Sequence, residues 1–346
     1  MPTSSAKRAW IAIAVLVGAA VLAAAVYVYR LHGPLPGSSA GTAPDILSQL
    51  PPGAPAVAYI DVAALRKLKD SPLAAVLGLS NTDPHADQEY KQFVRDTGFD
   101  YSRDLDRAAI AFWPANLPAP SSTASQSPVV AIGDGRFDQQ KIKAYALRSG
   151  KVLSRSTQTL YEVPGSPPVA FQFLSSSRIV LASGTGAENL LAPLSSLRRD
   201  PEMQSRIDRV AGSPIFAVAR TDNLPASFYG NLKSAPQFEA LARSVKGLTL
   251  AGQPDGNLIH VTLDAECDSM TDAMKFATFL DGFRILGAVA LADPKTRRQM
   301  TPEQFSLLEA LINQAKVTPQ ARWVRLTVDI TAAMLGDANS RSAMNR

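Results

Sequence analysis

Two patterns of apolar positions alternate along this chain: short apolar runs bounded by turn-forming residues, and longer stretches with apolar side chains at helical spacing. The short runs predict β-strands and the longer stretches predict amphipathic helices. Strands are predicted at residues 56–62, 107–113, 129–133, 152–155, 158–163, 169–174, 178–182, 215–220, 248–251, 258–263 and 323–330. Helices are predicted at residues 45–50, 63–68, 72–77, 87–96, 138–149, 187–194, 201–211, 236–246, 268–291 and 301–316.

The order of these elements predicts two similar halves. Each half runs strand, helix, strand, hairpin, strand, helix, strand, which is the βαββαβ order of a ferredoxin-like sheet. We therefore expect an α+β fold with a tandem duplication, an internal repeat of two ferredoxin-like halves with antiparallel sheets. The first α+β domain, with insertions, is expected at residues 45–212 and the second at residues 213–335, followed by a disordered tail at residues 336–346.

The N-terminal region carries a membrane signal. Residues 9–29 contain no charge, and at ~1.5 Å rise per residue they are long enough to cross the ~30 Å hydrocarbon core. Lys7 and Arg8 precede this run, which favours a cytoplasmic N-terminus. We expect residues 1–8 to be a short cytoplasmic N-terminus, residues 9–29 a single-pass transmembrane helix and signal anchor, and the Pro/Gly/Ser-rich residues 30–44 a flexible linker.

A cleaved signal peptide is the competing interpretation of the same run. Ala23, Ala24 and Ala25 offer small side chains to a peptidase, but the apolar run continues to Tyr29, longer than a usual signal-peptide core. Either interpretation places the rest of the chain outside the cytoplasm. We expect a bacterial inner-membrane protein whose main domain is periplasmic or otherwise extracytoplasmic.

Composition narrows the chemistry that the chain can perform. The net charge is +5, but no block of five or more Lys or Arg residues occurs, so the sequence predicts no nucleic-acid partner. The single cysteine, Cys267, excludes an intrachain disulfide and a thiolate metal site. The three histidines, His32, His85 and His260, lie far apart. The sequence therefore predicts no metal site and no cofactor.

A glycine pair after the strand at residues 129–133 raises the possibility of a phosphate-binding loop. Such a loop needs glycines so that backbone N–H groups approach the anion, and it follows the G-x-G-x-x-G or G-x-x-x-x-G-K-[ST] spacing. Gly133 and Gly135 match the first two glycines of G-x-G-x-x-G, but Asp138 stands at the position of the third. The carboxylate of Asp134 would also repel an anion. We therefore interpret this segment as the bend between a strand and a helix.

The second half contains a counterpart of this segment. When Asp134 is set against Asp264, Asp138 falls on Asp268, and both pairs follow a strand and precede a helix. The glycines are replaced there by other residues. Asp138 and Asp268 are expected to cap their helices.

The helix at residues 268–291 has more apolar surface than one helical stripe requires. Its large apolar side chains are Met270, Met274, Phe276, Phe279, Phe283, Ile285, Leu286 and Val289. One interpretation is a core helix packed on both sides; the other is an apolar groove for a lipid, a peptide or a partner helix. The candidate apolar ligand or partner surface consists of Met274, Phe279, Phe283 and Leu286.

Three segments together carry a resemblance to a group of known proteins. They are PAVAYIDVAALR at residues 55–66, FDYSRDLDRAAIA at residues 99–111 and VVAIGDGRFD at residues 129–138. The chain resembles uncharacterised bacterial membrane-anchored proteins of unknown function over roughly residues 45–330. These motifs are structural, so the resemblance implies no catalytic residue and no activity.

The sequence thus supports three hypotheses on function. The first is a non-catalytic, membrane-anchored extracytoplasmic module that binds an envelope protein or acts as a scaffold. The second is a carrier of a lipid or other apolar ligand at the helix of residues 268–291. The third is an envelope hydrolase, whose site would have to be assembled from distant residues and would show two convergent carboxylates or a Ser–His pair.

Overall fold

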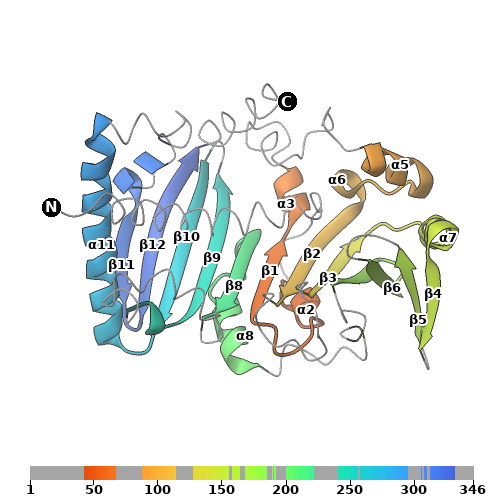
Figure 1. Cartoon of the computed structure of the whole chain (residues 1–346), viewed down its shortest axis with the longest axis horizontal. Helices are drawn as coiled ribbons and strands as arrows, with labels where there is room; N and C mark the ends of the chain where they lie inside the picture. Colours follow the sequence, from red (N-terminus) through yellow and green to blue (C-terminus); the bar gives the residue numbers. More distant parts are fainter. Residues whose placement is uncertain are drawn as a thin grey trace.

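A computed structural model describes residues 43–67, 88–113, 128–155, 158–163, 168–184, 189, 191, 200–221, 241–255, 258–294, 305, 308–309 and 312–331. Within these residues, one sheet of twelve strands extends across the molecule, and every neighbouring pair runs antiparallel (Figure 1). The strand order is β11-β12-β10-β9-β8-β1-β2-β3-β7-β6-β5-β4.

The strands are β1 (Ala56–Ile60), β2 (Leu105–Phe112), β3 (Val129–Gly135), β4 (Lys151–Arg155), β5 (Gln158–Val163), β6 (Val169–Ser175), β7 (Arg178–Ser183), β8 (Ile215–Arg220), β9 (Val245–Asp255), β10 (Leu258–Cys267), β11 (Lys316–Gln320) and β12 (Trp323–Thr331). The described helices are α2 (Ala43–Leu47), α3 (Val62–Arg66), α5 (Gln88–Thr97), α6 (Tyr101–Asp104), α7 (Gln139–Ser149), α8 (Pro201–Asp208) and α11 (Met270–Ala292).

Short polar side chains start most of these helices. Asp61, Asp100, Asp138 and Asp200 each accept a hydrogen bond from a backbone N–H in the first turn of α3, α6, α7 and α8. Ser269 caps α11 in the same way, through the N–H of Asp272. The expected cap at Asp138 is therefore confirmed, whereas at α11 the cap lies one residue after the expected Asp268.

The sheet is covered on both faces. Side chains alternate between the two faces along a strand, so Tyr59 and Ile60 of β1 point to opposite faces. Tyr59 belongs to the main core together with residues of α2 and α8. Ile60 packs against Val62 and Leu65 of α3, and α7 and α11 pack on that second face as well.

β1 and β8 hold the middle of the sheet together. They pair from Ala56 opposite Ala219 to Ile60 opposite Ile215. Strands from both predicted domains therefore belong to one sheet.

The prediction of two ferredoxin-like halves, and of an internal repeat built from them, is wrong. A ferredoxin-like unit contains βαβ crossovers, which place strands parallel to each other and helices on one face. In the described sheet every pair is antiparallel, and helices cover both faces. Element order along the chain could not reveal this, because the strands pair as neighbours in antiparallel ladders instead of across the helices.

The membrane-anchor prediction at residues 9–29 lies outside the described residues. None of the helices in the described part of the chain combines the length and the apolar content that a membrane span requires.

Two further differences concern local structure near the C-terminus. Within the predicted helix 301–316 the described residues 305, 308–309 and 312–314 are helical, but the prediction missed β11, which begins at Lys316 and pairs with β12 from Lys316 opposite Thr327 to Gln320 opposite Trp323. β9 extends to Asp255, beyond the predicted strand at residues 248–251, because it pairs with β10 along its length. In both places pairing with a neighbouring strand forms or lengthens a strand that the local sequence does not indicate.

Candidate functional site

α11 runs along one outer edge of the sheet, beside β11 (Figure 1). Its inner side carries small residues, since Ala273 and Ala277 are buried against the strands. Near its C-terminal end, a Cβ on Gly287 would lie 2.8 Å from Cδ1 of Ile312. Small side chains on this side let the helix approach its neighbours closely.

The outer side of α11 leaves large apolar side chains in solvent. Of the predicted surface, Met274 is 55% exposed and Leu286 is 68% exposed. Phe279 and Phe283 are half-buried, and their rings stack with centroids 6.2 Å apart. We call the exposed set the α11 face; it consists of Met270, Met274, Ile285, Leu286 and Val289.

The α11 face is unusual because it exposes large apolar side chains to solvent. A helix that is apolar on all sides is normally buried, and contiguous exposed apolar surface marks interaction sites. Residues 285–292 of α11 carry no charge, and the large apolar side chains exposed among them are Ile285, Leu286 and Val289. The structure therefore excludes the interpretation of α11 as a core helix packed on both sides.

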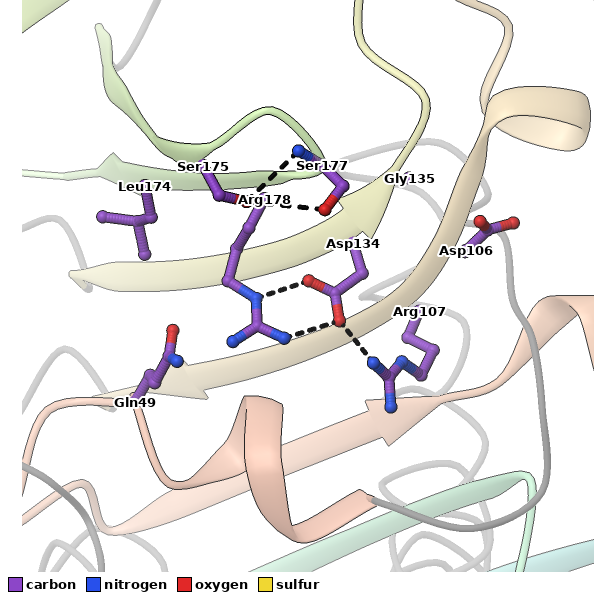
Figure 2. Close-up of a pocket in the computed structure, with 9 residues that line it drawn as sticks. All are labelled: Gln49, Asp106, Arg107, Asp134, Gly135, Leu174, Ser175, Ser177 and Arg178. Atoms are coloured by element: carbon purple, nitrogen blue, oxygen red, sulfur yellow. Dashed lines mark hydrogen bonds and ion pairs between the residues drawn. The ribbon is translucent and has the colours of Figure 1, made fainter.

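A second candidate is a pocket of about 400 Å³ near the end of β3 (Figure 2). Its lining residues are Gln49, Asp106, Arg107, Asp134, Gly135, Leu174, Ser175, Ser177 and Arg178. The lining is mainly polar, so the pocket does not suit a lipid.

Asp134 is the centre of this pocket. Arg178 donates two hydrogen bonds to its carboxylate, Nε to Oδ1 at 2.5 Å and a terminal nitrogen to Oδ2 at 2.9 Å. Arg107 donates a third to Oδ2 at 2.7 Å. Figure 2 shows both guanidinium groups directed at the carboxylate. The hydrogen bonds that Arg178 donates to Asp134, and then to Asp45 at 3.0 Å, raise the pKa of Arg178 further above its ordinary value.

Asp264 on β10 is held in the same manner. Arg325 donates two hydrogen bonds of 2.7 Å to its two carboxylate oxygens, and Arg209 donates one of 2.9 Å. Burial alone would raise the pKa of Asp264, but the hydrogen bonds from Arg325 and Arg209 hold it below its ordinary value. The guanidinium of Arg209 also lies over the ring of Trp323, 4.0 Å from its centroid.

The two aspartates occupy corresponding places in the sheet. β3 and β7 are the second and third strands outward from β1, as β10 and β12 are from β8. Asp134 lies opposite Arg178 and Asp264 opposite Arg325 in these ladders. The sequence comparison paired the aspartates, but it missed the arginines, which no local spacing links to them.

The arginines and carboxylates of this pocket bind each other, which leaves few polar groups available to a ligand. The guanidinium groups around Asp134 are already neutralised by carboxylates, so the pocket is not a prepared anion site. Both oxygens of Asp134 accept hydrogen bonds from Arg178 or Arg107, so the carboxylate is already occupied. Ser175 and Ser177 contact each other, with 3.4 Å between their hydroxyl oxygens. The hydrolase hypothesis gains no support from this pocket.

The glycines of the predicted bend belong to β3 itself. β3 continues to Gly135, and α7 starts only at Gln139. A Cβ on Gly135 would lie 2.4 Å from Cα of Leu105 and 2.5 Å from the carbonyl oxygen of Asp104. Gly135 is therefore needed for the close approach of the chain at the start of β2, and the segment is a strand end where we expected a bend.

A second polar pocket, of about 610 Å³, lies between α11 and the start of β11, with one residue from β12. It is lined by Asp281, Arg284, Asn313, Gln314, Ala315, Lys316, Val317 and Asp329. Asp329 also pairs with His260 on β10, with 2.6 Å between Oδ1 and Nδ1. This hydrogen bond raises the pKa of the exposed His260.

The described residues contain no group of three or more His, Cys, Asp or Glu side chains placed to hold a metal ion. Cys267 is buried, and burial raises the pKa of its thiol to about 11, which makes it a poor nucleophile. The other two histidines, His32 and His85, lie outside the described residues.

Comparison with known proteins gives only distant similarity. No protein-family model matches the chain, and no curated protein matches it. A solved structure of TP0453, in crystal form I, is 13% identical and covers 86% of this chain and 97% of its own, with a TM-score of 0.43. Crystal form III of TP0453 is 14% identical and covers 85% and 96%, with a TM-score of 0.46. These values establish neither a shared fold nor a shared function, and the sequence resemblance described above stays a prediction.

Proposed function

We propose that this protein is a non-catalytic binding or scaffold module of the bacterial cell envelope, which docks another envelope protein through the α11 face. The observation that carries the proposal is the exposure of Ile285, Leu286 and Val289 on a charge-free helical segment. Covering such side chains removes apolar area from water, which contributes about 25 cal/mol per Å² before the cost of association is subtracted. An extracytoplasmic location is supported by the uncharged run at residues 9–29, which directs the chain to the membrane.

A protein occupant is favoured over a carried lipid by the shape of the site. A carrier encloses most of its apolar ligand in a concave, mainly apolar cavity. The two pockets described above are mainly polar, and the exposed apolar side chains of α11 lie on an outward-facing helix surface. Helix faces of this kind pack against a groove or helix of another protein.

Site-specific photo-crosslinking on the full chain in living cells tests this proposal. A photoreactive phenylalanine analogue at Leu286 is expected to give one discrete protein adduct. The same analogue at Glu202, which is exposed on α8, serves as the matched control and is expected to give none. The paired change Ile285→Asp and Val289→Asp should abolish the adduct without lowering the unfolding temperature.

The mass of the adduct separates the hypotheses. An adduct of lipid mass would replace the protein-docking proposal by the lipid-carrier hypothesis. Equal adducts at Leu286 and Glu202, or none at Leu286, would remove the evidence for a specific surface on α11.

A further inference from the structure

α11 lies at one end of the described sheet, beside the outer strand β11 (Figure 1). Exposed positions form a row along the helix in steps of three or four residues, namely Met270, Met274, Thr278, Asp281, Ile285, Val289 and Ala292. Residues at this spacing are neighbours on a helix surface. The row is about 34 Å long at ~1.5 Å per residue, so a partner that covers it packs along the whole helix.

The row is symmetric about a point just before Gly282. Met274 and Val289 lie equally far from this point on opposite sides, and Thr278 and Ile285 do the same. A second copy of α11, antiparallel and related by a two-fold axis through this point, packs Met274 against Val289 of the other copy. Ile285 then packs against the methyl group of Thr278. An identical partner needs this equal spacing, whereas a different protein does not.

The two-fold axis passes beside a residue without a side chain. A Cβ added to Gly282 would meet no atom within 4 Å, so this position faces open space. The distance between packed helices is about 8–10 Å and depends on the side chains at the point of contact. Glycine at the axis therefore allows a close approach, which brings the apolar side chains on both sides of it into contact.

The charged side chains nearest the axis suit the same two-fold. Asp281 and Arg284 form an ion pair within α11, with 2.9 Å between Nε and Oδ1, and their side chains are 53% and 34% exposed. In the antiparallel pair, Asp281 of each copy comes beside Arg284 of the other. The four charges then alternate in sign around the axis and cancel. A single charge at this place would repel the same charge of a second copy, and this pair does not.

The other flank of the row is apolar. Leu286 is 68% exposed, and Phe279 is half-buried. The same side of each helix meets at an antiparallel two-fold interface, so Leu286 of each copy comes beside Phe279 of the other. Every large apolar side chain between the axis and the C-terminal end of the exposed surface thus has a counterpart in the other copy.

The area of the contact sets the strength of the dimer. The five side chains of the α11 face are each 55–68% exposed. A side chain of this size has about 60–120 Å² of apolar surface, so two copies together cover about 300–800 Å². Standard interfaces bury about 1,200–2,000 Å² in total, a little over half of it apolar. The dimer is therefore small and weak, and a covalent trap suits its detection.

We infer that the envelope protein docked on the α11 face is a second copy of this chain, with the two α11 helices packed antiparallel about a two-fold axis at Gly282. The inference rests on the proposed docking role of α11 and names the partner of that surface. The symmetric spacing of the exposed row and the self-complementary pair of Asp281 and Arg284 support it.

Disulfide trapping of the full chain in bacterial cells tests this arrangement. The cells are permeabilised and treated with copper phenanthroline, and dimers are detected on a non-reducing gel. The native thiol of Cys267 is buried, so the wild type should give no dimer. Gly282→Cys is expected to give a species of twice the chain mass, because both introduced thiols lie at the axis and a disulfide joins Cα atoms within about 7 Å.

Two further variants test the antiparallel register. Met274→Cys and Val289→Cys are each expected to give little dimer alone and a clear dimer when two differently tagged chains are produced together. In the antiparallel pair the two copies of residue 274 lie about 22 Å apart along the helix axis, too far for a disulfide. Glu202→Cys, at a position 67% exposed on α8, is the matched control for random collisions and should give none. Adding Ile285→Asp and Val289→Asp to Gly282→Cys should abolish its dimer.

Three results would overturn the inference. They are no dimer with Gly282→Cys, as much dimer with Met274→Cys alone as with the mixed pair, and as much dimer with Glu202→Cys as with Gly282→Cys.

The same experiments separate this inference from the proposed function. A photo-adduct at Leu286 with the mass of a different protein, together with no dimer of Gly282→Cys, would keep α11 as a docking surface and overturn the second copy as its partner. The absence of both the photo-adduct and the dimer would overturn both.

Discussion

Replacement of Asp264 by asparagine tests whether the buried ion pairs stabilise the sheet. Its side chain is 1% exposed and accepts three hydrogen bonds from Arg325 and Arg209. Charge-assisted hydrogen bonds contribute about 1.5–3 kcal/mol each, so their complete loss would cost about 5–9 kcal/mol. Asparagine keeps one acceptor oxygen, and the cost of burying the charge is recovered. We therefore expect the free energy of unfolding to fall by about 2–4 kcal/mol.

Urea unfolding followed by tryptophan fluorescence measures this change, because Trp323 lies against Arg209 and reports on the site. Asp281→Asn is the matched control, since Asp281 pairs with Arg284 on the surface of α11 and should leave the unfolding midpoint nearly unchanged. A loss under about 1 kcal/mol for Asp264→Asn would refute the role of this cluster in stability.

The pH dependence provides a second check on the same variant. The pKa of Asp264 is lower in the folded protein than in the unfolded chain, where it is about 3.9. Such a group stabilises the fold fully above the unfolded pKa, and this contribution is lost as pH falls through the folded pKa. The stability difference between wild type and Asp264→Asn should therefore be complete at pH 7 and should narrow below about pH 4. A difference that stays constant from pH 7 to pH 2.5 would contradict the assignment.

Three further predictions follow from single positions. Gly135→Ala should destabilise the protein by about 2 kcal/mol or more in thermal unfolding, because the new Cβ would overlap the backbone of Leu105; an unchanged melting temperature would contradict the close approach. The NMR titration of His260 should show a pKa above about 6.5 that falls in Asp329→Asn; no change would mean that the hydrogen bond is not formed in solution. Cys267 should react with a thiol reagent at pH 8 slowly in the folded protein and rapidly in urea, and fast reaction of the folded protein would show that its thiol is not buried.

Most of the described strands and helices could be predicted from the sequence. The boundaries of β5 and β8 agree with the predicted ranges, and α7 and α11 begin within two residues of their predicted starts. Alternation and helical spacing reflect which side chains are buried, so they carry information on each element by itself. β11 was missed because its strand conformation depends on pairing with β12, and nothing within residues 316–320 signals that pairing.

The apolar character of α11 was also visible in the sequence, but its exposure was not. The sequence pattern predicts that Met274, Phe279, Phe283 and Leu286 are apolar side chains of one helix. Only the packing of α11 at the edge of the sheet decides that Met274 and Leu286 face solvent while the two phenylalanines stack on each other.

The sequence by itself thus determined most of the described strands and helices, the absence of a nucleotide-binding loop motif and of a thiolate metal motif, and the uncharged run at residues 9–29. The tertiary structure alone decided that the strands form one antiparallel sheet and that Asp134 and Asp264 are held by arginines 44 and 61 residues away. It also decided that β4 and β11 are the two outer strands of the described sheet. The physical reason is that backbone conformation is encoded locally by burial and propensity, whereas strand order and ion pairing depend on contacts between residues far apart in the chain.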